Sequence, residues 1–96
     1  LVEFIAALAE GKVVSSDSFE QMLAGGWYNP ETRWHYGYGL FVDNRRRGFS
    51  HAGLWPGYRT YVRHCLLNGT TVSVQTNRDG KVDLRGIADR INPCLP

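Results

Sequence analysis

The chain has 96 residues, a formal net charge of +2 and a hydrophobic fraction of 43%. A chain of this length forms one domain at most and buries roughly 60–65% of its unfolded surface. The composition excludes the disordered class, and so small a net charge does not by itself indicate a nucleic-acid or membrane partner. No apolar run approaches the ~18 residues of a spanning helix, and no signal peptide is visible. Because the chain starts at Leu1 inside a helical pattern and without Met, we expect a fragment of a longer protein.

The first 26 residues predict a lead-in of two short helices. Apolar side chains recur at helical spacing in the first of them, at Leu1, Phe4, Ile5 and Leu8. Gly11 ends this helix, and the second begins near Ser15 or Ser16, whose hydroxyls can cap it. Asp17 then falls in the first turn, where its negative charge suits the helix dipole. Gly25-Gly26 ends the second helix.

Residues 27–96 predict an antiparallel sheet of three to four strands followed by a helix, and hence an α+β fold. Residues 27–33 are predicted as a loop, since they contain the Asn29-Pro30 pair. Strands are expected at 36–42, 48–53, 58–66 and 70–76. Turns would join them at Asp43 to Arg47, at Trp55-Pro56-Gly57 and at Asn68-Gly69. The last of these is the strongest hairpin signal, because Asn and Gly both tolerate the positive φ of a type I′ turn.

A final helix is indicated by four apolar residues that share one face, Leu84, Ile87, Ala88 and Ile91. Pro93 ends it. One helix covers only one face of so small a sheet, so the other face and at least one edge would remain bare, which stable proteins avoid. We therefore expect a missing N-terminal region or a second chain to complete the sheet. Residues 1–26 and 27–96 would then together form part of one domain.

The chain has two cysteines, Cys65 and Cys94, whose spacing matches no zinc or redox motif. The favoured interpretation is two separate, partly buried thiols. The alternative is a disulfide that ties the C-terminal tail to the sheet. It would close a loop of about 28 residues and stabilise the fold by roughly 3 kcal/mol in the chain-entropy model. Such a bridge would indicate an exported protein.

The sequence contains no complete catalytic motif. Neither lysine, Lys12 or Lys81, has a serine three residues before it, so no S-x-x-K pair can form. A G-x-S-x-G elbow, an H-E-x-x-H pair and a Walker loop are also missing. The histidines at positions 35, 51 and 64 are too scattered to indicate a metal site, and no cofactor is indicated. His51 is the one candidate whose position in the sequence suggests a specific role, because it lies at a strand end that leads into a turn.

The stretch from Trp34 to Asn77 resembles the region around the third motif of the serine beta-lactamase and penicillin-binding-protein-like hydrolases, a family that includes class C beta-lactamases, D-alanyl-D-alanine carboxypeptidases and esterases. There a Tyr-Gly-x-Gly strand leads to a [Lys/His]-x-Gly triplet, a Pro-Gly-aromatic turn and a strand pair ending near Asn. The corresponding residues here are Tyr36 to Leu40, His51-Ala52-Gly53, Pro56-Gly57-Tyr58 and Thr76-Asn77. The two helices from Leu1 to Leu23 resemble those that precede this region, so the similarity covers nearly the whole chain.

The resemblance implies an active-site role for His51, which stands where many members carry lysine. It would support the proton-shuttling residues and the substrate, although only part of a histidine population is charged at neutral pH. Gly53 would let a ligand approach the strand closely, and the backbone N–H of Leu54 would be one donor of the oxyanion hole. Ala52 and Trp55 would contact the substrate. Ala52 replaces a Ser or Thr whose hydroxyl would bind a substrate carboxylate, which favours a peptidase or esterase over a typical beta-lactamase.

Other features have a structural interpretation. Tyr36 and Tyr38 are expected to pack in the sheet, with only Trp55 near the site. Arg45 to Arg47 reads as a solvated hairpin tip. The sequon Asn68-Gly69-Thr70 is interpreted as a turn, not a glycosylation site.

The implied parent protein is a serine hydrolase that cleaves small-molecule or peptide amide or ester bonds through an acyl-enzyme. Its S-x-x-K serine would lie upstream, so the fragment alone is expected to be inactive. The resemblance implies no cofactor, metal, nucleic acid or membrane span, and it favours an exported protein. Two alternatives remain. One is a stand-alone binding module for an anionic partner, supported by Arg59 and Arg63 on the outer side of a strand and tested by salt dependence. The other is an inactive, truncated relic.

Overall fold

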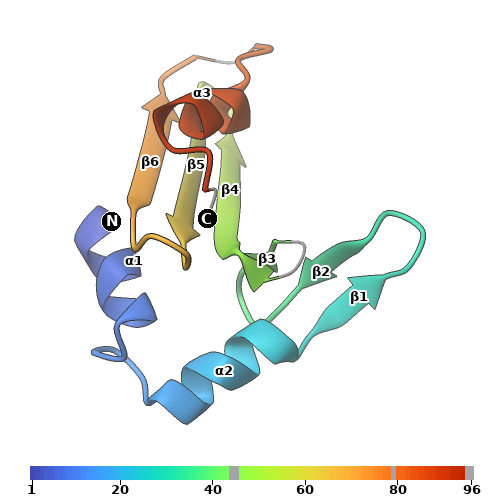
Figure 1. The fold of residues 1–96 in the computed structure, drawn as a ribbon. Helices are drawn as coiled ribbons and strands as arrows, with labels where there is room; N and C mark the ends of the chain where they lie inside the picture. Colours follow the sequence, from blue (N-terminus) through green and yellow to red (C-terminus); the bar gives the residue numbers. More distant parts are fainter. Residues whose placement is uncertain (44–45, 79, 95–96) are drawn as a thin grey trace.

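The computed structural model describes residues 1–43, 46–78 and 80–94 and has an α+β fold. In these residues three helices accompany one six-stranded antiparallel sheet (Figure 1). In chain order the elements are α1 (Val2–Ala9), α2 (Ser16–Ala24), β1 (Trp27–Asn29), β2 (Trp34–Tyr36), β3 (Phe41–Val42), β4 (Gly48–Trp55), β5 (Tyr58–Cys65), β6 (Thr71–Thr76) and α3 (Leu84–Ile91). The fold class is confirmed, whereas the expected three to four strands are too few.

One source of the additional strands is the segment predicted as a loop. β1 and β2 pair antiparallel, with Trp27 opposite Tyr36. Pro30 lies in the turn that joins them, where the Asn29 side-chain oxygen accepts a hydrogen bond from the Glu31 N–H at 2.9 Å. The Asn-Pro pair therefore marks the turn of a hairpin, and the prediction of a loop over 27–33 is wrong for Trp27–Asn29 and right for residues 30–33.

The other source is the single strand expected at 36–42, which is divided in two. The Gly37 N–H donates to the Leu40 carbonyl at 2.7 Å and closes a tight turn between β2 and β3. β3 retains only two residues. The turn predicted at 43–47 falls partly on residues 44–45, which lie outside the described part of the chain.

The strands follow one another across the sheet in sequence order, and β4 and β5 pair along their whole length. Pro56-Gly57 joins these two strands, with Gly57 at a φ of 84°, as the second central position of a type II turn requires. Trp55 therefore ends β4 instead of lying in the turn. In the next hairpin only Gly69, at a φ of 74°, has a positive φ, so the type I′ assignment of Asn68-Gly69 is wrong. The Gly69 N–H instead bonds the Cys65 carbonyl at 2.9 Å across a longer loop.

Two small cores lie on opposite faces of the sheet. α3 lies over β5 and β6 (Figure 1), and the core beneath it contains Tyr61, Val72, Leu84 and Ala88. α1 and α2 cover one end of the opposite face, where the second core contains Leu8, Phe19, Leu23, Leu40, Val42 and Phe49. The expectation that the face opposite α3 is bare is therefore wrong for the end that α1 and α2 cover. In the described residues it holds toward the turn between β4 and β5, where β4 is exposed.

The three predicted helices are confirmed. The Ser15 hydroxyl caps α2 by accepting a hydrogen bond from the Ser18 N–H at 3.1 Å. Asp83 caps α3 in the same way through the Gly86 N–H at 2.9 Å. Ile91, which its spacing places on the apolar face of α3, is 63% exposed. None of the described helices combines the length and apolar character needed to cross a bilayer.

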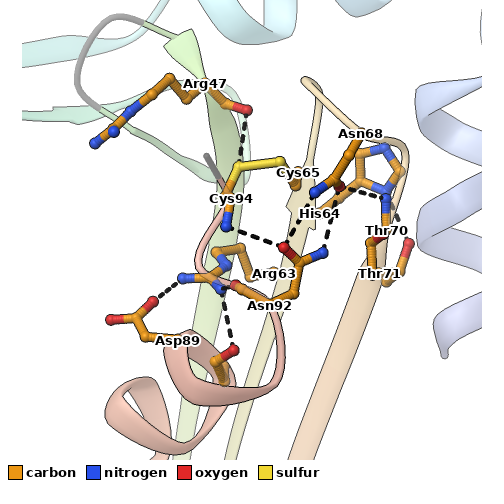
Figure 2. Close-up of a disulfide and its surroundings, with 11 residues drawn as sticks. Arg47, Arg63, His64, Cys65, Asn68, Thr70, Thr71, Asp89, Asn92 and Cys94 are labelled. Atoms are coloured by element: carbon orange, nitrogen blue, oxygen red, sulfur yellow. Dashed lines mark hydrogen bonds and ion pairs between the residues drawn. A yellow bond between two sulfur atoms is a disulfide. The ribbon is translucent and has the colours of Figure 1, made fainter. Parts of the chain in front are cut away.

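Cys65, at the end of β5, and Cys94, beyond α3, form a disulfide (Figure 2). The favoured prediction of separate thiols is therefore wrong, and the alternative is confirmed. Both cysteines are buried. The Cys94 sulfur lies 3.4 Å from the Arg47 carbonyl oxygen, which is a packing contact because a disulfide sulfur has no proton to donate. The side chains of Asn68 and Asn92 exchange hydrogen bonds of 3.1 and 3.3 Å and hold the same segment.

Arg63 on β5 is buried beneath α3, with 8% of its surface exposed. Its guanidinium contacts the Asp89 carboxylate, donates to the Ala88 carbonyl at 3.2 Å and donates to the Asn92 carbonyl (Figure 2). Arg59, on the same side of β5, donates to two carbonyl oxygens of the segment before α3 at 2.6 and 3.2 Å. The two arginines face α3, so the prediction that they lie on the outer side of the strand is wrong.

Candidate active site on strand β4

The second half of β4 is exposed although it belongs to the sheet. Gly48 and Phe49 are buried, whereas the residues from His51 to Trp55 are all exposed. The short β3 is the cause, because it pairs only with Phe49 and Ser50. Beyond this point no strand of the described residues lies along that side of β4. His51 to Trp55 therefore form an open strand edge, which we call the β4 edge.

The backbone of Leu54 points into the β4 edge. In an antiparallel pair, successive residues turn their N–H and C=O groups alternately to either side. On the β3 side, the Gly48 carbonyl accepts a hydrogen bond from the Asp43 N–H at 2.8 Å. On the β5 side, the Arg47 carbonyl accepts one from the Leu66 N–H at 2.8 Å. Even-numbered residues of β4 therefore direct their backbone groups away from β5, and the Leu54 N–H is a donor without a strand partner in the described residues.

The side chains of β4 alternate between the two faces. His51, Gly53 and Trp55 project to the face that carries α1 and α2, whereas Ala52 and Leu54 project to the α3 face. A cavity of ≈ 310 Å³ has His51 in its wall, and a second of ≈ 520 Å³ has Ala52 in its wall. All five predicted site residues thus lie on the β4 edge, but the side chains of Ala52 and Leu54 project to the face opposite that of His51.

Two aromatic rings position His51. Its Nε2 lies 3.2 Å from the Tyr36 hydroxyl oxygen, within hydrogen-bond distance. The Phe41 ring lies 5.9 Å from the imidazole and 4.6 Å from the Tyr36 ring, measured between centroids. The interpretation of Tyr36 as sheet packing is therefore incomplete, since its hydroxyl also contacts the candidate residue. Tyr38 is 59% exposed and lies in the wall of the same cavity as His51.

The other two histidines have structural partners. His35 Nε2 lies 2.6 Å from the Gly25 carbonyl oxygen, to which it donates from the half-buried β2. His64 is buried, with its Nδ1 2.7 Å from the Thr71 hydroxyl oxygen. Burial lowers the pKa of His64 from its ordinary value, because desolvation penalises the charged form. Only His51 of the three is exposed.

Gly53 lies directly opposite Thr60 on β5. A Cβ on Gly53 would lie 2.6 Å from the Thr60 hydroxyl oxygen. The glycine therefore leaves room for a hydroxyl from the neighbouring strand, in addition to the close approach of a ligand that the sequence suggested. Sequence reasoning missed Thr60. The register set by the two-residue Pro56-Gly57 turn was the signal that could have found it.

Comparisons with known proteins identify the family and the fold of the chain. A protein-family model described as Beta-lactamase matches residues 1–92. The structure of a penicillin binding protein from Bacillus halodurans resembles the chain with a TM-score of 0.70 and 20% sequence identity, over 88% of this chain and 27% of that one. The chain thus spans about a quarter of that protein, and at this identity the likeness shows the fold alone. A search of curated proteins finds no match. Because the family match covers nearly its whole length, the chain belongs to the beta-lactamase family.

Proposed function

We propose that this segment forms one wall of the active site of a serine hydrolase that cleaves amide or ester bonds through an acyl-enzyme. The observation that carries the proposal is the β4 edge, where an exposed His51 and the outward N–H of Leu54 lie three residues apart on one strand. Membership of the beta-lactamase family supports the reaction class. The nucleophile would lie outside these 96 residues, since they hold no S-x-x-K pair.

His51 would assist the groups that move the proton. Its ring is exposed on the face that carries α1 and α2, and the Tyr36 hydroxyl fixes its orientation at Nε2. An imidazole held in this way can donate a hydrogen bond to a substrate or to a proton-shuttling residue, and when protonated it also supplies positive charge.

The Leu54 N–H would be one donor of the oxyanion hole, with the second supplied by the nucleophile's backbone. Such a preorganised donor contributes about 2.7–4 kcal/mol of transition-state stabilisation. The backbone of Ala52 is directed to the same open edge, so an extended acyl chain of the substrate would pair with it as an added strand. The indole of Trp55, 73% exposed, would pack on the bound substrate.

Residues 1–26 and 27–96 would contribute to one domain that a further region or a second chain completes. The free side of β6, the last strand of the sheet in the described residues, supports this arrangement. The Cys65–Cys94 disulfide supports an oxidising compartment and hence export.

The test is His51→Ala in the full reading frame that encodes this segment. We expect kcat/KM for a chromogenic beta-lactam or a p-nitrophenyl ester to fall about 100-fold, because general acid–base assistance typically contributes 10²–10⁴-fold. His51→Lys should retain most of the activity, because lysine also donates a hydrogen bond and carries a positive charge. Arg90→Ala, at an exposed position of α3, is the matched control. Wild-type activity in His51→Ala, or turnover by the isolated 96 residues, would contradict the proposal.

A smaller effect is expected from Tyr36→Phe, which keeps the ring against Phe41 and removes only the hydroxyl on His51. The loss of one neutral hydrogen bond, worth about 0.5–1.5 kcal/mol, should lower kcat/KM by roughly 2- to 13-fold. In a His51→Ala background the same change should have no further effect, because its partner is gone. Additive losses in the double variant would show that the hydroxyl acts independently of the histidine.

The structure disfavours the alternative of an anion-binding module. Arg59 and Arg63, on which it depended, are bound to backbone carbonyls and to Asp89 around α3. Arg46 pairs with Glu20 at 2.5 Å, while Arg45 lies outside the described residues. An inactive relic would show no hydrolysis by the full reading frame.

A further inference from the structure

We infer that Asn68 is a site of spontaneous deamidation, and that the C-terminal segment of residues 92–94 controls its rate by holding the Asn68 side chain. Asn68 precedes Gly69 in the loop between β5 and β6, where residues 67–70 are all exposed. The side chain meets that of Asn92, as Figure 2 shows. The modification needs only water, so it does not depend on the proposed hydrolase activity.

Deamidation begins when the backbone nitrogen of Gly69 loses its proton and attacks the side-chain carbonyl carbon of Asn68. A nitrogen–carbon bond forms and closes a cyclic imide, while the bond from that carbon to the side-chain nitrogen breaks and ammonia leaves with the proton. Water then opens the imide at either carbonyl and gives aspartate or isoaspartate. The net change replaces an amide by an acid, without oxidation or reduction.

The residue that follows an asparagine determines how readily this ring closes. Gly69 has no side chain to obstruct the attack, and a Cβ built on it would have no described heavy atom within 4 Å. The other asparagines of the chain precede proline, at positions 29 and 92, or arginine, at positions 44 and 77. Proline has no amide proton to lose, and an arginine side chain crowds the approach. Asn68 is therefore the asparagine whose sequence context favours the reaction most.

The folded loop holds both reacting groups in hydrogen bonds. The Gly69 N–H donates to the Cys65 carbonyl at 2.9 Å, so the attacking nitrogen retains its proton. The Asn68 side chain donates to the Asn92 side-chain oxygen at 3.1 Å and accepts from the Asn92 side-chain nitrogen at 3.3 Å. It also accepts from the Thr70 N–H at 3.1 Å. Ring closure breaks the first bond and turns the side chain out of the others, so it takes place from a locally opened loop.

Asn92 reaches this loop because the segment after α3 is fixed to β5. The Cys65–Cys94 disulfide ties the chain just beyond Asn92 to the end of β5. The Cys94 N–H donates to the Asn92 side-chain oxygen at 3.0 Å, and Arg63 bonds the Asn92 carbonyl. Release of this segment therefore frees the Asn68 side chain while β5 and β6 remain paired.

Deamidation is expected to weaken the contact that delays it. A carboxylate at position 68 cannot donate to the Asn92 side-chain oxygen, so one of the two bonds between these side chains is lost. Its charge also lies beside Asn92, the C-cap of α3, where the helix dipole is negative. The modified protein should therefore unfold at a lower urea concentration than the unmodified protein.

The test incubates the protein encoded by the full reading frame in mildly alkaline buffer and follows the mass of the peptide that contains Asn68. We expect the native protein to deamidate at least about 10-fold more slowly than the protein unfolded in urea, because the opened loop is a minor state. Asn92→Ala should accelerate the native reaction about 10-fold, the combined effect of two neutral hydrogen bonds. Arg90→Ala, exposed on α3, is the matched control and should keep the wild-type rate. In Asn68→Gln, whose longer side chain closes a ring far less readily, the mass change should disappear.

A measurement on the unsubstituted protein separates release of the C-terminal segment from global unfolding. If the segment opens alone, the deamidation rate should rise only weakly with urea below the unfolding transition. A rise with the full m-value of unfolding, an unchanged rate in Asn92→Ala, or equal rates in the native and unfolded protein would overturn the control by this segment. An unfolded protein that gains no mass at Asn68 would overturn the site itself.

Discussion

Replacing Arg63 with methionine is expected to lower the free energy of unfolding by about 3 kcal/mol. Arg63 reaches from β5 to the end of α3, where its guanidinium bonds the carbonyls of Ala88 and Asn92 as well as the Asp89 carboxylate. The last carbonyls of a helix lack partners further along the helix, so Arg63, whose side chain comes from β5, acts as a C-terminal cap of α3. Methionine fills a similar volume but removes the donor of the Asn92 carbonyl and leaves the Ala88 carbonyl with the Asn92 N–H alone. The loss is measurable by urea unfolding.

The Asp89→Asn variant distinguishes the contribution of the capping hydrogen bonds to stability from that of the ion pair. The Asp89 side chain is 49% exposed, so its charge is largely solvated and its attraction to Arg63 is screened. We expect this variant to cost less than about 1 kcal/mol, because the asparagine oxygen still accepts from the guanidinium and the two carbonyl bonds remain. Arg90→Ala, one position further along α3 and exposed, should cost almost nothing. If Asp89→Asn proved as damaging as Arg63→Met, the ion pair and not the capping would dominate.

The sequence predicted the helices well because their signals are local. A side-chain cap such as Ser15 or Asp83 and a helical apolar stripe act within one or two turns of the chain. The strands that the sequence missed or merged lack such signals. β1, β2 and β3 have three, three and two residues, too few for an alternating pattern, and they exist because neighbouring strands pair with them. Turn residues such as Pro30 therefore predict a loop when the sequence is considered alone.

The same difference between local and long-range signals applies to the candidate site. His51, Gly53 and Leu54 could be named because a short motif lies on a single strand. Their surroundings come from other strands: the Tyr36 hydroxyl from β2 and the Thr60 hydroxyl from β5. The first contact depends on how β2 and β3 twist relative to β4, which residue spacing does not determine. The second was implicit in the register of the β4–β5 hairpin.

Reduction of the Cys65–Cys94 disulfide is expected to lower the free energy of unfolding by about 3–4 kcal/mol. The two cysteines are 29 residues apart in sequence, so the bridge removes a large amount of chain entropy from the unfolded state. The sequence could not decide this pairing, because the position of Cys94 depends on the direction in which α3 returns across β5. Unfolding by urea with and without dithiothreitol measures the change, and alkylation of the released thiols followed by intact mass verifies the reduction.

A Cys65→Ala/Cys94→Ala variant is the matched control, since it should unfold near the midpoint of the reduced protein and should not respond to dithiothreitol. Both cysteines are buried, so the native bridge is expected to react slowly until the chain unfolds. Reduction should therefore be carried out on the unfolded protein and followed by refolding. Asn92 and Asn68 still connect the segment after α3 to the β5–β6 hairpin when the bridge is open, so the native fold should survive in a less stable form. A reduced protein with an unchanged midpoint would mean that native-state strain cancels the entropic gain.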